Sequence, residues 1–324
     1  MQLQDIFNKY EGELRNVEEC LRNSINSEVA LIPELSNHLI SSGGKRFRPL
    51  LLLMSSDLCG YRGERRYAMS LVLEFIHTAS LLHDDVVDHA NTRRGKESAN
   101  NVWGNSASVL VGDYLYSKAF KIMAEDSDLA VVKLISTTSN TMAEGEVFQL
   151  VKSGDFEITE KDYFSLIEKK TAILISAACA LGAIMAKVSE AQISALMRFG
   201  MRLGTAFQMT DDTLDYTATE KEFGKAIGTD LREGKITLPL IHTLKRCTPP
   251  ERNLIRKVVK KEDPEESDIA EIVSIIRKHN GIEYALSRAK NCVQEGKALL
   301  DAFADSEPKR ALITLADFIL NRNL

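Results

Sequence analysis

The sequence has few cysteines, and their placement excludes a disulfide framework. There are five in the whole chain, an odd number, far apart and without a CxxC pair. This usage is typical of a protein from a reducing compartment. The chain also opens without a basic segment followed by an apolar run. We therefore expect no signal peptide and a cytoplasmic location.

An excess of positive charge is also missing. The chain has 41 Lys and Arg residues against 46 Asp and Glu residues, a formal net charge of −5. Proteins that bind nucleic acids usually carry a basic excess, so no nucleic-acid partner is expected. The hydrophobic share of 44% and the charged share of 27% are those of an ordinary globular protein, and they exclude a disordered or coiled-coil chain.

The sequence lacks an apolar run of membrane-spanning length. The strongest candidate, residues 171–186, is uncharged and is bracketed by Lys170 and Lys187. It is shorter than the roughly 20 residues that a bilayer requires. The sequence therefore predicts a buried helix at the centre of the protein and no membrane span.

Proline is absent between Leu50 and Leu238. Because an interior proline costs about 3 kcal/mol in a helix, this long gap favours long helices. Apolar residues recur at helical spacing over residues 71–86, 131–147, 272–276 and 299–303, and no sustained strand-like alternation is present. We predict an all-α chain that forms one domain over residues 1–324.

Two acidic clusters with the same internal spacing stand out, DDVVD at residues 84–88 and DDTLD at residues 211–215. In each, the first and last Asp lie one helical turn apart on one face, where like charges repel unless a cation is bound. Mg²⁺ is the natural occupant, because it prefers oxygen ligands and keeps sites for water and phosphate. One such cluster alone is as readily a solvated helix end. Two copies, each after a mainly apolar segment, indicate carboxylates at the rim of an apolar cavity.

Basic residues accompany both clusters. Each alone is a weak signal and fits ordinary surface charge, but acids for Mg²⁺ together with bases for phosphate oxygens indicate diphosphate substrates. They lie in the turn SGGKRFRP (42–49), in the pair that follows the first cluster, at the start of the central apolar helix and after the second cluster: Lys45, Arg46, Arg48, Arg93, Arg94, Lys169, Lys170, Lys225 and Lys235.

Seven motifs together resemble the trans-isoprenyl diphosphate synthase family, and within it the bacterial long-chain polyprenyl synthases of the octaprenyl type. They are GGKRFRP (43–49), EFIHTASLLHDDVVDHANTRRG (74–95), SVLVGDYLYSKAF (108–120), AEGEVFQL (143–150), KKTA (169–172), GTAFQMTDDTLDYTA (204–218) and FGKAIGTDLREGKITLPL (223–240). The resemblance implies the isoprenoid synthase fold, a single bundle of long, mostly antiparallel helices around a deep apolar cavity. It also implies a homodimer, with a peripheral membrane contact for release of the product.

The resemblance also implies roles for particular residues. Three Mg²⁺ ions would be held by Asp84, Asp85 and Asp88 from one side and by Asp211, Asp212 and Asp215 from the other. Catalysis would rest on Asp84, Asp85, Asp88, Asp211 and Asp212 together with Lys170 and Lys235. The allylic diphosphate would contact Arg93, Lys170, Lys225 and Lys235, and isopentenyl diphosphate would contact Lys45, Arg48, His77 and Arg94. Thr171 and Gln208 would offer oxygen dipoles to the allylic cation. On its own, His77 fits a core histidine equally well.

The implied reaction joins isopentenyl diphosphate to an allylic diphosphate such as farnesyl diphosphate. Mg²⁺, Lys and Arg offset the charge of the leaving diphosphate, the C–O bond ionises, and the isopentenyl double bond attacks the allylic cation before a proton is lost. The expected product is a long all-trans polyprenyl diphosphate, near octaprenyl, for a quinone side chain.

Product length is expected to depend on small residues before the first cluster. Ser80 lies one turn before Asp84, and Ala79 precedes it. In the family, large aromatic residues at these positions stop growth early, so small residues imply a long product. Close helix packing is the alternative reason for small residues there. Ile76 and Leu73 are deeper candidates for the cavity floor.

Other functions stay open on the sequence alone. One is a shorter-chain synthase that makes farnesyl or geranylgeranyl diphosphate. Another is a non-catalytic subunit that binds prenyl diphosphates, although two complete acidic clusters speak against it. A terpene cyclase is a third, and the second DDxxD together with the GGKRFRP turn favours elongation instead.

Overall fold

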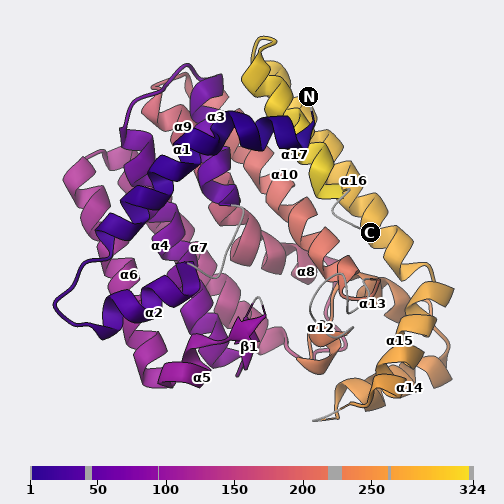
Figure 1. Cartoon of the computed structure of the whole chain (residues 1–324). Coiled ribbons are helices and arrows are strands. Elements are labelled where there is room, and N and C mark those ends of the chain that lie inside the picture. The colour runs from indigo at the N-terminus through magenta and orange to yellow at the C-terminus, as the bar shows by residue number, and fades with distance from the viewer. Residues whose placement is uncertain (1, 41–45, 94, 218–227, 262–263, 321–324) are drawn as a thin grey trace. The chain divides into compact units, whose positions relative to one another are not determined.

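The computed structural model describes residues 2–40, 46–93, 95–217, 228–261 and 264–320. Coiled ribbon dominates Figure 1, and the described residues contain one small antiparallel hairpin, β1 (Thr92–Arg93) with β2 (Lys96–Glu97). The prediction of an all-α fold is therefore confirmed. The hairpin was not predicted, because two residues per strand are too few to show alternation.

The chain divides into two compact units, each assembled from separate stretches. Unit 1 comprises Met1–Ser139, Leu174–Gly200 and Leu300–Leu315, and unit 2 comprises Asn140–Ile173, Met201–Leu299 and Ala316–Leu324. The unit boundaries fall inside four of the helices given below. The single domain expected from the sequence stays a prediction.

Unit 1 contains the N-terminal helices, the hairpin and parts of four helices that it shares with unit 2. Its elements are α1 (Leu3–Ser24), α2 (Leu31–Ile40), α3 (Phe47–Leu58), α4 (Arg65–Val87), β1, β2, α5 (Ala99–Trp103), α6 (Asn105–Asp126), the start of α7 (Leu129–Lys152), nearly all of α9 (Ile173–Met185), the start of α10 (Glu190–Leu214), the 3₁₀ turn η2 (Leu300–Ala302) and most of α17 (Glu307–Leu320).

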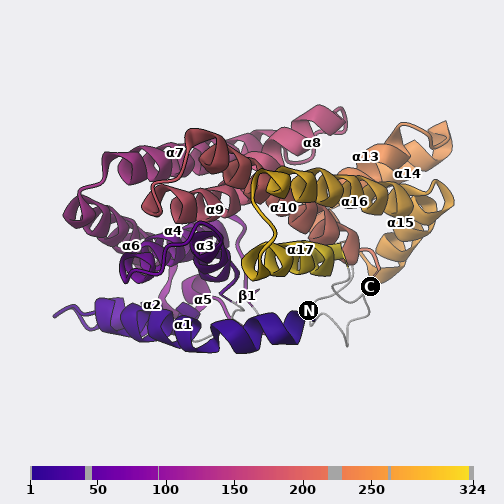
Figure 2. The same ribbon diagram turned by 90° about the horizontal axis from the view of Figure 1, so that it is seen from above.

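Unit 2 contains the ends of α7, α10 and α17 and a set of shorter helices. Those helices are α8 (Glu160–Ile167), the π-helical turn η1 (Glu168–Ala172), α12 (Thr229–Arg232), α13 (Leu238–Leu244), α14 (Pro249–Val259), α15 (Glu266–Lys278) and α16 (Gly281–Leu299). Figures 1 and 2 both show α13 to α16 gathered together, and α13 packs against α8, α15 and α16.

Helix α4 forms the centre of unit 1. It packs against α1, α3 and α6, and its apolar side chains Leu73, Phe75, Ile76 and Leu82 are fully buried. Full burial of one such side chain contributes about 1.5–3 kcal/mol relative to exposure. Apolar residues on nearly every face of α4 therefore fix the helix that carries the first acidic cluster.

Helix α9 confirms the predicted buried helix. Eleven of its residues are buried, including Cys179 and Gly182. No helix within the described ranges is both long and apolar enough to cross a bilayer.

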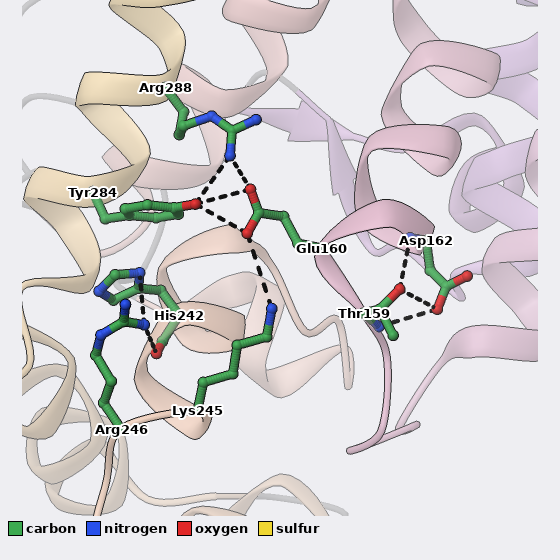
Figure 3. Close-up of polar contacts among 8 residues, drawn as sticks. All are labelled: Thr159, Glu160, Asp162, His242, Lys245, Arg246, Tyr284 and Arg288. Atoms are coloured by element: carbon green, nitrogen blue, oxygen red, sulfur yellow. Dashed lines mark hydrogen bonds and ion pairs between the residues drawn. The ribbon is translucent and has the colours of Figure 1, made fainter.

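Unit 2 fixes the start of α8 through side-chain contacts. Thr159 and Asp162 form a capping box, in which the Asp162 N–H donates to Thr159 Oγ1 over 3.1 Å and the Thr159 N–H donates to Asp162 Oδ2 over 3.0 Å. Figure 3 shows Glu160 reaching toward α16, where the Tyr284 hydroxyl donates to Glu160 Oε1 over 2.9 Å and Arg288 forms an ion pair with the same carboxylate. The capping box thus fixes the first turn of α8, and the contacts of Glu160 with Tyr284 and Arg288 hold α8 against α16.

Candidate active site

The first acidic cluster ends α4 in unit 1. Asp84 and Asp85 lie in the last turn, and Asp88 is the C-cap, whose N–H donates to the Asp84 carbonyl over 2.8 Å. The helix stops because His89 adopts a left-handed conformation with φ +50°. A helix C-terminus carries about half a negative charge, and carboxylates there add to it. The end of α4 is thus a strongly negative position that favours a bound cation.

The middle Asp of this cluster turns into the protein. Asp85 is fully buried, and Arg93 of β1 donates to its Oδ1 from Nε over 2.6 Å, with a second nitrogen at 2.5 Å. The hairpin turn that brings Arg93 there uses Gly95 at φ +76°. In this structure, the guanidinium expected at the allylic diphosphate therefore lies against Asp85.

The second acidic cluster ends α10 in unit 2, where the same addition of helix dipole and carboxylate charge applies. Its middle Asp is again buried: Asp212 is 6% exposed. The Tyr163 hydroxyl donates to Asp212 Oδ2 over 2.6 Å, and Gln208 Nε2 donates to Oδ1 over 2.7 Å. Burial raises the pKa of Asp212 to about 7, the two hydrogen bonds oppose this shift, and the charge of Asp211 adds to it.

The last Asp of the second cluster anchors the chain that follows it. Asp215 accepts the N–H groups of Thr229 and Asp230, each over 3.1 Å, at the start of α12. Asp230 lies nearby, and burial together with the charges of Asp212 and Asp215 raises its pKa well above the ordinary range. The short α12 then leads to Lys235, whose N–H donates to the Asp230 carbonyl over 2.8 Å.

A cavity of about 130 Å³ lies in unit 2 beside this cluster. Five residues predicted from the sequence line it: Lys170, Thr171, Gln208, Asp212 and Lys235. Apolar side chains and Tyr163 form another part of the cavity wall. Burial and the charge of Asp212 raise the pKa of Tyr163 well above its ordinary value. The Tyr163 hydroxyl therefore keeps its proton and acts as a donor.

The π-helical turn η1 brings Lys170 and Thr171 to this cavity. Two glycines allow neighbouring helices to approach its backbone. A Cβ at Gly145 of α7 would lie 2.9 Å from the Lys170 nitrogen, and one at Gly204 of α10 would lie 2.5 Å from the Ala172 Cα. Such π turns are frequent at functional sites.

The side chains of the η1 turn are already engaged. Lys170 Nζ donates to Glu146 Oε2 over 2.7 Å, and the Thr171 hydroxyl donates to Gln208 Oε1 over 2.8 Å. Lys235 has a similar carboxylate contact, with its Nζ 2.6 Å from Glu233 Oε2. Both ammonium groups thus line the cavity while they pair with a neighbouring glutamate.

The comparisons with known proteins agree with these features. The sequence model of the Polyprenyl synthetase family matches residues 29–276, more than half of the chain. The chain belongs to the polyprenyl synthetase family. It is 40% identical over 323 residues to octaprenyl diphosphate synthase of Haemophilus influenzae, an alignment that covers 100% of this chain and 98% of that one.

Two solved polyprenyl synthases share the fold. A decaprenyl diphosphate synthase from Rhodobacter capsulatus is 37% identical with a TM-score of 0.94, covering 99% of each chain. A polyprenyl synthase from Caulobacter crescentus CB15, complexed with calcium and isoprenyl diphosphate, is 37% identical with a TM-score of 0.95, covering 100% of this chain and 98% of that one. The family resemblance and the isoprenoid synthase fold expected from the sequence are confirmed.

Several residues expected at the substrates of a polyprenyl synthase are only partly described. Lys45, Arg94 and Lys225 lie outside the described residues. Arg48 lies half-buried in the first turn of α3, and His77 lies half-buried on α4. Their assignment to isopentenyl diphosphate stays a prediction.

The residues expected to set product length lie on α4. Ala79, Ile76 and Leu73 are fully buried, while Ser80 is half-buried and its hydroxyl donates to the His77 carbonyl over 2.9 Å. Ala79 is thus both small and completely buried, which fits a position in a cavity wall and equally fits a close contact between helices. The role of these four residues in product length stays a prediction.

One residue of the unit 2 cavity, Tyr163, was missed from the sequence, and the inward contacts of Arg46 in unit 1 were not predicted. Tyr163 lies seven residues before Lys170, a spacing that places both near one helical face, and this was an available signal. Arg46 was read only as one basic residue of the GGKRFRP turn. Its side chain turns inward, where it pairs with Glu18 of α1 and, over 3.1 Å, with Glu74 of α4.

Proposed function

We propose that this chain is a trans-polyprenyl diphosphate synthase that condenses isopentenyl diphosphate with an allylic diphosphate such as farnesyl diphosphate. Its expected product is a long all-trans chain near octaprenyl. The observation that carries the proposal is the pair of acidic clusters, each at the C-terminal end of a long helix. The product length rests on a full-length relative named as an octaprenyl diphosphate synthase.

The donor set fits Mg²⁺. No group of three or more His, Cys, Asp or Glu side chains within the described ranges is arranged to hold a metal ion by itself. Mg²⁺ is usually bound by one or two carboxylates, with water and substrate phosphate at its remaining positions. We assign this binding to Asp84 and Asp88 and to Asp211 and Asp215. Bound there, Mg²⁺ would offset the negative charge of the diphosphate.

The cavity lysines supply further positive charge. Lys170 and Lys235 are partly exposed, with side-chain exposures of 22% and 25%. When substrate binds, Lys170 would exchange the Glu146 carboxylate for a phosphate oxygen, and Lys235 would exchange that of Glu233 in the same way. Each ammonium ion would therefore stay paired. Both lysines would then stabilise the leaving diphosphate without the cost of an unpaired charge.

The reaction balances without a protein nucleophile. The C–O bond of the allylic diphosphate breaks, and its electron pair leaves with the diphosphate. The isopentenyl double bond then forms the new C–C bond, and the lost proton goes to the departed diphosphate. The Thr171 and Gln208 oxygens line the cavity where the positive charge would develop.

We also propose a homodimer, with α6 as part of its surface. Val109 and Phe120 lie three turns apart on one face of α6, and Leu110 lies beside them with 67% of its surface exposed. Clustered apolar side chains of this kind are covered in most soluble proteins. A Leu110→Asp change should halve the mass measured by light scattering, whereas an unchanged mass would exclude this surface.

An elongation assay tests the activity. Purified protein is incubated with Mg²⁺, farnesyl diphosphate and labelled isopentenyl diphosphate, and label in prenyl products is counted. We expect Asp84→Ala to lower the rate about 100- to 1000-fold, as loss of a transition-state charge contact does. The control Asp305→Ala removes an exposed carboxylate and should have no effect. A folded wild-type protein without elongation from any allylic diphosphate would overturn the proposal.

A further inference from the structure

A chain of hydrogen bonds runs along the wall of the unit 2 cavity. It joins four residues in the order Tyr163, Asp212, Gln208 and Thr171, with donor–acceptor distances of 2.6, 2.7 and 2.8 Å. All four line the cavity. They come from α8, from the adjoining η1 and from α10, so the chain of bonds ties α8 and η1 to a helix that is remote in the sequence.

The direction of each bond follows from the chemistry of the groups. Asp212 accepts at both oxygens, from the Tyr163 hydroxyl and from the Gln208 amide nitrogen, and both bonds favour its charged form. The bond from Nε2 to Asp212 sets the orientation of the Gln208 amide, so that its oxygen, Oε1, points away from Asp212. That oxygen has only lone pairs to offer, so Thr171 must donate its single hydroxyl proton to it.

The consequence falls on Thr171. A hydroxyl whose proton is engaged has only lone pairs left for any other partner. Thr171 therefore presents a fixed acceptor oxygen to the cavity and cannot turn a proton toward it. An acceptor held in this orientation stabilises positive charge, and it needs no reorganisation when the charge appears.

We infer that Tyr163 is a positioning residue that acts through Asp212 and Gln208 to hold the Thr171 oxygen as an acceptor facing the reacting carbon. Asp212 then serves this network rather than the metal. This inference rests on the proposed prenyl transfer. It revises the sequence-based expectation that all three Asp residues of the second cluster bind Mg²⁺.

Tyr163→Phe tests the inference, because it removes one hydroxyl from a fully enclosed side chain. A hydrogen bond to a charged group is typically worth enough for about a tenfold change in rate. We expect kcat to fall about tenfold, with the KM for isopentenyl diphosphate and the Mg²⁺ half-saturation changed less than twofold. An unchanged kcat would overturn the inference.

Tyr284→Phe is the matched control. The Tyr284 hydroxyl also donates to a carboxylate in unit 2, that of Glu160 (Figure 3). Neither of these two residues lines the cavity. The same atom is lost, so a purely structural role for Tyr163 predicts equal effects on kcat in both variants. We expect kcat to fall only in Tyr163→Phe.

A double-mutant cycle with Thr171→Val separates the network from a local effect. If Tyr163 acts through Thr171, its removal has little further effect once the hydroxyl is gone, and the two losses are not additive. Thr171→Ser keeps the hydroxyl and should restore both the rate and the sensitivity to Tyr163→Phe. Fully additive losses would contradict the proposed route.

Metal binding gives a readout independent of turnover. Calorimetry measures Mg²⁺ binding in the presence of farnesyl thiodiphosphate, a substrate analogue that ionises poorly. We expect Asp211→Asn to weaken Mg²⁺ binding and Asp212→Asn to leave it within twofold of wild type. Equal weakening by both changes would make Asp212 a metal ligand and overturn this part of the inference, even where Tyr163→Phe does not fold. Absence of elongation by the wild type would instead count against the proposed function.

Discussion

Arg46 should contribute far more to stability than an exposed arginine of the same unit. Its guanidinium pairs with Glu18 and Glu74 and donates to the Ile40 carbonyl over 2.8 Å. The Arg46 and Glu74 side chains are only 10% and 5% exposed. Removing one partner from such a buried pair costs about 3–5 kcal/mol, because the remaining charge loses its compensation in a medium of low polarity.

Arg46→Met keeps most of the side-chain volume and removes the charge. We expect the free energy of unfolding, measured by urea titration at pH 7.5, to fall by about 3 kcal/mol. The control is Arg15→Met on α1. Arg15 and its partner Glu11 have side chains 66% and 70% exposed, so that change should cost about 0.5 kcal/mol or less. A loss below about 1 kcal/mol for Arg46→Met would refute the reasoning from burial.

Three further changes probe the cavity turn, the product length and the pH dependence. Gly204→Ala should lower kcat at least tenfold, because its Cβ would lie 2.5 Å from the Ala172 Cα beside the η1 turn. Ser80→Phe should shorten the products, as sized by chromatography after dephosphorylation. Glu251→Gln should lower the Tm at pH 7, because hydrogen bonds from Lys278 and the Thr248 backbone hold the pKa of Glu251 below its ordinary value.

The first two changes have matched control variants, and the third is checked by its dependence on pH. Gly12→Ala on α1 meets no atom within 4 Å and should leave kcat unchanged. Val87→Phe adds a ring at a 58% exposed position of α4 and should leave product length unchanged. The stability that Glu251 contributes is present above the unfolded-state pKa and is lost as the pH falls through the folded-state pKa. The Tm difference for Glu251→Gln should therefore shrink below about pH 4, and a difference constant with pH would contradict the assignment.

The fold class was predictable because the signals are local. The proline-free stretch and the helical spacing of Leu73, Ile76 and Leu82 follow from the geometry of one helix, and α4 has these residues buried. Pro249 and Pro250 are a local signal as well. They occupy the first turn of α14, a place where the missing proline N–H groups cost nothing.

The division of roles within each acidic cluster was not predictable from spacing. The sequence presents Asp84 and Asp85, or Asp211 and Asp212, as equivalent carboxylates. Their difference depends on which partner a distant segment brings, Arg93 from the hairpin in one case and Tyr163 from α8 in the other. Such long-range pairings leave no periodic trace in a single sequence.

The most direct test of the account is the length of the product. Wild-type protein is incubated with farnesyl diphosphate, Mg²⁺ and labelled isopentenyl diphosphate, and the dephosphorylated products are sized by chromatography. The account predicts all-trans chains near octaprenyl, lost in Asp84→Ala. Products that stop at geranylgeranyl length, one unit beyond the primer, would contradict the role given to Ala79 and Ser80, and a complete absence of elongation would contradict the prenyltransferase itself.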